Sequence, residues 1–340
     1  MASTLVILVL SIVALRHYHI GITMAQLDIG VNYGMVGDNL PSPATVVQLY
    51  KRYIIGKMRL YDPNPDVLNA LRGSGIDVTL GIKNQDLPSI ASSADAAKTW
   101  FDTNVQPYVS DINFQYITAG NEVVPGDLAQ YVLLAMQNLQ TTISNYKYTG
   151  LRVSTVVASS TLGSSYPPSS GVFTDIARAD MIGIINFLSS TSSPLLVNAY
   201  PYFAYASDPT NVRLDYAQFT APGPVVQDGN LSYSNLLDAI VDAFYWAMEK
   251  EGVSSVDVVV SESGWPSAGN GDFTTPQLAQ TYNQNFVKKF LAKQATPKRP
   301  DHYLEGFIFA MFNEDQKPQG VEQNWGLFYP DGTPVYPVFS

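Results

Sequence analysis

The sequence contains no cysteine and only three histidines. The absence of cysteine excludes thiol catalysis, cysteine-containing zinc sites and disulfide bonds, so the fold has to be stabilised by packing alone. Two of the histidines, His17 and His19, lie in the first 25 residues, which leaves His302 for the rest of the chain. One histidine cannot build a histidine-rich metal site, and a serine triad is not expected either. We therefore expect no metal and no cofactor.

Basic residues are also few, with 19 lysines and arginines against 29 acidic residues and a formal net charge of −10. No stripe of basic residues is visible, so nucleic acid is not an expected partner. A neutral ligand suits this chain better. Hydrophobic residues make up 46% of the sequence and charged residues 14%, which is ample for a large core and argues against disorder.

An apolar run of twelve residues, Thr4 to Leu15, stands near the start of the chain. It is too short to span a bilayer and is followed by Thr23-Met24-Ala25, with small residues where a signal peptidase cleaves. We expect residues 1–25 to be a removable secretion signal and 26–340 to be a single mature domain. No lysine or arginine precedes the run, which departs from the usual signal pattern. Removal of Arg16 would change the net charge to −11, with 18 basic against 29 acidic residues.

Eight short apolar segments alternate with helical patterns along the rest of the chain. Such alternation predicts an α/β protein, and eight units predict a single (β/α)8 TIM barrel. Residues 204–234 are expected to form a loop with a hairpin. The expected strands are 27–33, 57–61, 77–82, 115–120, 152–158, 194–199, 257–262 and 306–311, and the expected helices begin at Pro43 and Pro276 or cover 65–71, 95–105, 128–143, 173–188 and 235–251.

Two glutamates follow predicted strands of this barrel. Glu122 comes directly after the fourth strand, and Glu262 ends the seventh, after the valines of 258–260. Because all strand ends of a barrel meet at one face, the two carboxylates can face each other across 140 positions of sequence. Such a pair is what glycosidic cleavage needs, with one protonated acid and one carboxylate that attacks carbon or activates water. A merely solvated or salt-bridged glutamate is the alternative for either position.

Competing motifs are missing. The stretch 62–66 imitates a calcium loop, but Val67 stands where the turn glycine is required. Dinucleotide loops, phosphate loops and a nucleophile elbow are also absent.

The residues around both glutamates resemble a known family. Gly120-Asn121-Glu122-Val123 and Val258 to Ser267 (VVVSESGWPS) are similar to the two signatures of plant glycoside hydrolase family 17, the β-1,3-glucanases. Other stretches fall in the family's order, namely 30–35, 58–63, 166–169, 195–203, 309–314 and 325–328.

The resemblance implies a retaining endo-hydrolase of β-1,3-glucosidic linkages in cell-wall β-glucan, with Glu122 as acid/base and Glu262 as nucleophile. Retention implies carboxyl groups about 5 Å apart. At that separation, the charge of Glu262 alone is expected to raise the pKa of Glu122 enough to keep it protonated. The resemblance assigns supporting roles to Asn121 and to an ion pair of Glu314 with Lys317, and it assigns the lining of the sugar cleft to Tyr33, Tyr200 and Phe203.

Two departures from the family pattern are visible: Asn32 stands where many members have cysteine, and Asp315 follows Glu314 where an amide is common. Neither touches the signature carboxylates. Trp265 either packs beneath the cleft floor or contacts sugar. Two alternatives remain open, a β-1,3-1,4-glucanase (lichenase) of the same family and a catalytically silent secreted carbohydrate-binding protein.

The expected setting is extracellular, in the apoplast or cell wall, with a role in plant defence or wall remodelling. No lipid-anchor tail follows Ser340, so we expect no membrane association once the signal is removed, and we expect a monomer. Asn230-Leu231-Ser232 is a glycosylation sequon that needs a surface loop.

Overall fold

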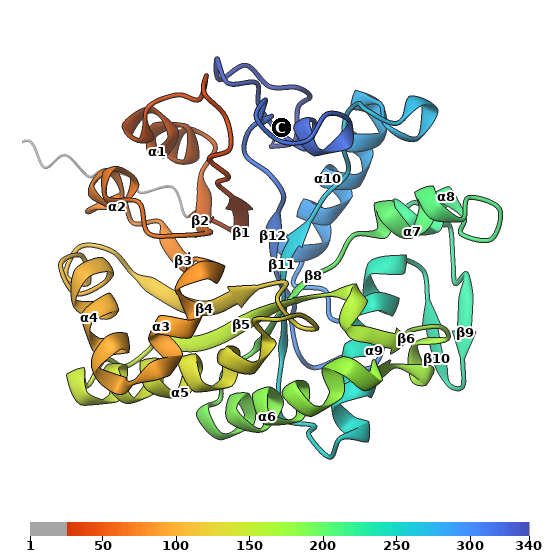
Figure 1. The fold of residues 1–340 in the computed structure, drawn as a ribbon. Helices are drawn as coiled ribbons and strands as arrows, with labels where there is room; N and C mark the ends of the chain where they lie inside the picture. Colours follow the sequence, from red (N-terminus) through yellow and green to blue (C-terminus); the bar gives the residue numbers. More distant parts are fainter. Residues whose placement is uncertain (1–25, 340) are drawn as a thin grey trace, which may run out of the picture.

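The computed structural model describes residues 26–339, and the expected secretion signal lies outside them. Eight parallel strands close into a barrel in the order β1-β12-β11-β8-β5-β4-β3-β2, so the first strand lies beside the last (Figure 1). The prediction of a (β/α)8 barrel is confirmed. The barrel strands are β1 (Leu27–Asn32), β2 (Ile55–Leu60), β3 (Asp77–Gly81), β4 (Phe114–Asn121), β5 (Arg152–Ala158), β8 (Leu195–Asn198), β11 (Val258–Ser263) and β12 (Glu305–Ile308).

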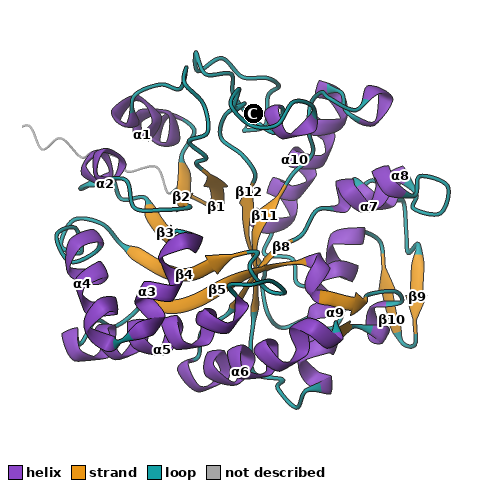
Figure 2. Ribbon diagram, viewed as in Figure 1, coloured by secondary structure: helices purple, strands orange, loops and turns teal. Residues whose placement is uncertain are grey.

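Helices surround the strands (Figure 2). Because they cover the outer face while side chains fill the interior, the strands need apolar residues on both faces. All six residues of β11 are buried, which agrees with its unbroken valine run. At the opposite end from the predicted glutamates, Lys57 on β2 forms ion pairs with Asp28 of β1 and Glu305 of β12. These pairs join the two ends of the chain where the barrel closes.

The long helices follow their sequence signals. Ser42 caps the first helix by accepting a hydrogen bond from the Thr45 amide at 3.4 Å, and Pro43 occupies the first helical position. The predicted helix 65–71 is correct at both ends. The predicted helices are observed as α1 (Pro43–Arg52), α2 (Pro65–Leu71), α4 (Ala94–Asn104), α5 (Ala129–Tyr146), α6 (Asp175–Thr191), α9 (Leu236–Lys250) and α10 (Pro276–Leu291). Short 3₁₀ turns are η1 (Asn84–Asp86), η2 (Ser159–Thr161), η3 (Pro168–Ser170), η4 (Gly271–Phe273) and η5 (Val321–Gln323).

Several short elements differ from the prediction. The sequence pattern did not predict α3 (Leu87–Ser92). It also did not predict two helices near the expected loop 204–234: the end of α7 (Pro201–Ser207) lies in this segment, and α8 (Leu214–Ala217) lies entirely within it. These three helices have four to seven residues, and so few turns make an apolar period hard to recognise. The predicted hairpin in this segment is present as β9 (Val226–Asp228) and β10 (Leu231–Tyr233).

Many predicted boundaries differ from the observed ones, by up to three residues, and two of the differences have a visible cause. The helix expected from 173 begins at Asp175, because Thr174 caps it and the two preceding residues form β7 (Val172–Phe173), which pairs with β6 (Leu162–Ser164). The eighth barrel strand, expected to reach Met311, ends at Ile308. Beyond it, Met311 still donates its amide to the Asn32 carbonyl at 2.8 Å, but outside a regular ladder.

Asn230 lies at the exposed tip of the β9–β10 hairpin, away from the barrel (Figure 1). This is the surface position that a glycosylated asparagine requires, and its modification stays a prediction. Trp265 is fully buried, donates its ring N–H to the Phe273 carbonyl at 2.9 Å and packs on Tyr202 and Tyr282. It therefore supports the core.

Buried charges gather between α9 and α10. Asp238 forms an ion pair with Lys289 at 2.8 Å, and both side chains are buried. Asp242, one turn further along α9, is fully buried and accepts the Lys298 amide at 2.9 Å. Burial raises the pKa of Asp242 to about 6.

We predict that Asp242→Asn flattens the pH dependence of stability. The pKa of Asp242 in the folded state lies above its unfolded value, so its stabilising contribution is complete below about pH 4 and is lost as pH rises through about 6. Between pH 4 and 7 the free energy of unfolding of the wild type should fall more than that of the variant, by at most about 3 kcal/mol. Chemical denaturation across this range measures the difference. Asp301→Asn, at an exposed position, is the control and should keep the wild-type slope; equal slopes in Asp242→Asn and wild type would contradict the prediction.

Candidate active site

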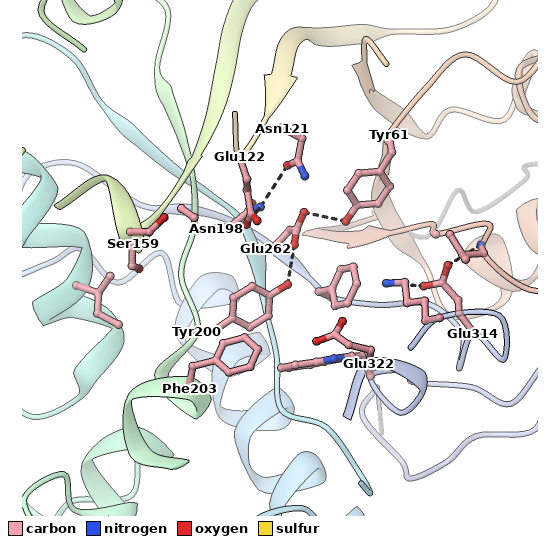
Figure 3. Close-up of a pocket in the computed structure, with 18 of the residues that line it drawn as sticks. Tyr61, Asn121, Glu122, Ser159, Asn198, Tyr200, Phe203, Glu262, Glu314 and Glu322 are labelled. Atoms are coloured by element: carbon pink, nitrogen blue, oxygen red, sulfur yellow. Dashed lines mark hydrogen bonds and ion pairs between the residues drawn. The ribbon is translucent and has the colours of Figure 1, made fainter. Parts of the chain in front are cut away.

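A cleft of about 730 Å³ opens at the carboxyl ends of the barrel strands. Its lining includes residues from the ends of four strands or just after them: Tyr61 after β2, Glu122 after β4, Asn198 at the end of β8 and Glu262 in β11. Figure 3 shows the side chains of Glu122, Asn198 and Glu262 converging in its centre. The barrel therefore brings together the two glutamates that the sequence analysis paired.

Glu262 is held by three donors. Arg59 Nη1 and the Tyr61 hydroxyl donate to Glu262 Oε1 at 2.6 and 2.9 Å, and the Tyr200 hydroxyl donates to Oε2 at 2.6 Å. Both carboxylate oxygens are thus fixed in direction by groups in or just after β2 and after β8. Such a fixed orientation is compatible with the nucleophile role predicted for Glu262.

Arg59 connects several site residues from a position only 1% exposed. Its Nη2 donates to Asn121 Oδ1 at 2.8 Å, while Nη1 contacts Glu262. The predicted supporting residue Asn121 therefore lies beside the guanidinium. Arg59, Tyr61 and Asn198 were not among the predicted site residues. The feature that could have identified Arg59 as a site residue is its charge within β2, a strand in which every residue is buried.

Glu122 has a different environment. Its φ of 56° is uncommon for a residue other than glycine, and its amide donates to the Val156 carbonyl at 2.9 Å. Asn198 Nδ2 donates to Glu122 Oε1 at 2.7 Å. Burial is the largest cause that raises the pKa of Glu122, and the charge of Glu262 is the second. The expected effect of the Glu262 charge on the pKa of Glu122 is therefore present, but desolvation by the protein contributes more.

The three predicted cleft aromatics all line the cleft, in different ways. Phe203 is 46% exposed and offers an open apolar face beside Trp325, with ring centroids 5.7 Å apart. The Tyr200 hydroxyl donates to Glu262, so its ring is held in place along the side of the cleft. Tyr33 is nearly buried, and burial together with the charge of Glu314 raises its pKa to about 12. The sequence analysis did not identify Trp325 as a cleft residue.

Glu314 and Lys317 form an ion pair at 3.2 Å on the cleft wall. Glu314 Oε1 also accepts the Val36 amide at 2.8 Å. Gly34 lies against this carboxylate, where an added Cβ would come within 2.4 Å of Glu314 Oε2. The auxiliary catalytic role of the pair stays a prediction.

The two residues that depart from the family pattern, Asn32 and Asp315, both make hydrogen bonds. Asn32 is fully buried and its Nδ2 donates to the Tyr61 hydroxyl at 2.9 Å and to the Ser261 carbonyl at 3.0 Å. It thereby supports one of the donors to Glu262. Asp315 accepts the Asp38 amide at 3.2 Å, outside the carboxylate network. Within residues 26–339, no three His, Cys, Asp or Glu side chains gather in a group that could hold a metal ion.

A (β/α)8 barrel that presents two glutamates in different environments in one cleft, Glu262 buried and Glu122 accessible, is the arrangement of a glycoside hydrolase. The model of glycosyl hydrolases family 17 matches residues 29–339. The chain belongs to this family and is a glycoside hydrolase.

Its relatives are similar over almost their full length. A probable glucan endo-1,3-beta-glucosidase, BG4, of Arabidopsis thaliana is 55% identical over 321 residues, which cover 94% of this chain and 93% of the relative. Lichenase-2 of Hordeum vulgare is 46% identical and covers 92% of this chain and 98% of its own length. The solved structure of CJP38, a beta-1,3-glucanase and allergen of Cryptomeria japonica pollen, has a TM-score of 0.87, 47% identity and coverage of 92% and 98%.

We predict that Glu262→Gln lowers the pKa of Glu122. The substitution removes a negative charge that raises this pKa and leaves the positive charge of Arg59, which lowers it. Carbon-13 NMR titration of Glu122 in wild type and variant measures the change. Glu314→Gln, which removes another cleft carboxylate, is the control and should have a smaller effect. An unchanged pKa in Glu262→Gln would mean that burial or another neighbour tunes Glu122.

Proposed function

We propose that this enzyme is a retaining endo-β-1,3-glucanase in which Glu122 is the acid/base and Glu262 the nucleophile. The observation that carries the proposal is the contrast between the two carboxyl groups. Glu262 is buried and oriented by three donors, including a guanidinium, whereas Glu122 opens to the cleft with a raised pKa and a single side-chain donor. One group is thus prepared to attack as a carboxylate and the other to hold a proton.

In the first step, Glu122 donates its proton to the glycosidic oxygen as the bond from that oxygen to C1 breaks, and the electron pair of the bond stays on the oxygen. A carboxylate oxygen of Glu262 forms the new bond to C1. This ester removes the negative charge of Glu262, which had raised the pKa of Glu122. Glu122 therefore loses its proton more easily and is present as the carboxylate that serves as base in the second step.

In the second step, the Glu122 carboxylate takes a proton from water while the water oxygen bonds to C1. The bond from C1 to Glu262 breaks, and its electron pair returns to the carboxylate. Two inversions at C1 give net retention, and both glutamates recover their starting states.

The shape of the cleft supports internal cleavage. Glu122 and Glu262 lie between Ser159 on one side and Glu314 on the other, and all four line the same cleft (Figure 3). Sugar units can therefore occupy positions on both sides of the scissile bond. A chain-end enzyme would need only one of these sides to be extended.

The relatives' names support β-1,3-glucan as the substrate, because several are glucan endo-1,3-beta-glucosidases. Lichenase-2 keeps mixed β-1,3-1,4-glucan as the second candidate. The hydrogen bonds that orient both glutamates argue against a catalytically silent protein. A neutral polymer also suits a chain with net charge −10.

The biological setting follows from the same proposal. We infer a secreted monomer that acts on cell-wall β-glucan in plant defence or wall remodelling. Within residues 26–339, none of the helices combines the length and the apolar character that a membrane crossing requires.

We predict that the enzyme cleaves linear β-1,3-glucan faster than mixed-linkage β-1,3-1,4-glucan, and that early products are oligosaccharides of several lengths. Reducing-end assays on a panel of linkage-defined glucans, with chromatography of early products, measure both points. Glu262→Gln provides the background rate. Faster cleavage of the mixed-linkage polymer would favour a lichenase, and early release of mainly glucose would rule out internal cleavage.

We predict retention at the anomeric carbon. Proton NMR of the first-formed reducing ends should show the β anomer, followed by slow mutarotation to the mixture. Immediate appearance of the α anomer would remove Glu262 from the nucleophile role and would require a wider separation of the two carboxyl groups, on the order of 6.5–9.5 Å.

A further inference from the structure

We propose that Asn198 is a positioning residue that determines which oxygen of Glu122 carries the catalytic proton. This inference rests on the proposed function, because it concerns Glu122 as the acid. It depends on the orientation of the Asn198 side-chain amide and on the hydrogen bonds that this orientation allows.

The orientation of the Asn198 amide follows from its surroundings. Asn198 Oδ1 accepts the Ser261 hydroxyl at 2.8 Å and faces Arg59 Nη1 at 3.4 Å. A guanidinium can only donate hydrogen bonds, so a flipped amide would set its NH₂ group against another donor. Arg59 is buried and cannot turn toward solvent to avoid that clash, whereas the Ser261 hydroxyl could adapt by accepting. The oxygen therefore faces the guanidinium, and the NH₂ group faces the cleft.

The NH₂ group meets both residues of the Asn121-Glu122 pair. It donates to Glu122 Oε1 at 2.7 Å and approaches Asn121 Oδ1 at 3.3 Å. Because an amide nitrogen donates, Glu122 Oε1 has to accept. A proton on Oε1 would point at an N–H hydrogen, so the proton of the neutral acid resides on Oε2.

The consequence is a single direction of proton transfer. Oε2 is the oxygen from which the proton passes to the glycosidic oxygen when the C1–O bond breaks, and to which a proton from water returns in the second step. Without Asn198, the proton could sit on either oxygen and the carboxyl group could rotate. Fixed orientation of this kind is part of general acid catalysis.

Asn198 is also connected to both glutamates, directly to Glu122 and through Arg59 to Glu262. In the barrel its Cα pairs with that of Glu262 across β8 and β11, and Arg59 contacts both Glu262 Oε1 and Asn198 Oδ1. The amide thus connects the guanidinium that holds the nucleophile with the oxygen of the acid. The hydrogen bond from Asn198 also lowers the pKa of Glu122, against the effect of burial.

The test is the leaving-group dependence of kcat/KM in Asn198→Ala. A dinitrophenolate leaves without a proton, whereas the sugar of a β-1,3-gluco-oligosaccharide needs one. With aryl β-laminaribiosides and unmodified oligosaccharides, we expect a loss of about 10- to 100-fold for oligosaccharides and less than about 3-fold for the dinitrophenyl substrate. The basic limb of the pH profile should move to higher pH, because a donor that favours the ionised form of Glu122 is gone.

Three comparisons make the outcome decisive. Ser261→Ala keeps Asn198 but removes one donor that orients it, so it should show the same pattern with a loss of about 3- to 10-fold, and it serves if Asn198→Ala does not fold. Asn283→Ala removes another buried asparagine, one that donates to Tyr336 outside the cleft, and should keep the wild-type leaving-group dependence. Glu122→Ala should show the strongest dependence.

Equal losses for all leaving groups in Asn198→Ala, or a basic limb that does not move, would overturn the positioning role. If Glu122→Ala itself shows no leaving-group dependence, the proposed acid assignment fails instead. The two failures are therefore distinguishable in the same set of measurements.

Discussion

The buried guanidinium of Arg59 is the constraint on which the catalytic face depends. It contacts Glu262, Asn121 and Asn198, which come from three other barrel strands, and it has almost no exposure to solvent. A buried cation is costly unless it is paired, so its partners have to be in place for the barrel to close around it. Loss of either member of the Arg59–Glu262 pair would leave a charge uncompensated in the core. Fold and nucleophile geometry are thus coupled.

The same network makes two identical side chains chemically different. Glu262 accepts from three groups that point at it, whereas Glu122 lies beside a neutral amide and is partly cut off from water. Asn198 stands between these environments and contacts both the guanidinium and Glu122. The proposed acid and nucleophile can therefore share one cleft although both are glutamates.

Much of the fold and the two central residues could be predicted because they leave local signals. Valine runs marked β11, Ser42-Pro43 marked the start of α1, and glutamates after strands marked the catalytic face. Short helices such as α3 and α8 escaped prediction because few residues carry little periodicity. Tyr61 and Asn198 escaped as site residues because a tyrosine or an asparagine at a strand end has many ordinary uses.

The sequence by itself determined the strand and helix order, the absence of thiol chemistry and the pair of glutamates that a barrel would bring to one face. Alternation of apolar segments and the position of each glutamate are local properties, so they are readable along the chain. Only the tertiary structure decided the direction of each donor, the burial that raises the pKa of Glu122 and the side of Asn198 that faces it. These depend on distances between β2, β4, β8 and β11, and residues up to 203 positions apart have to meet before such distances exist.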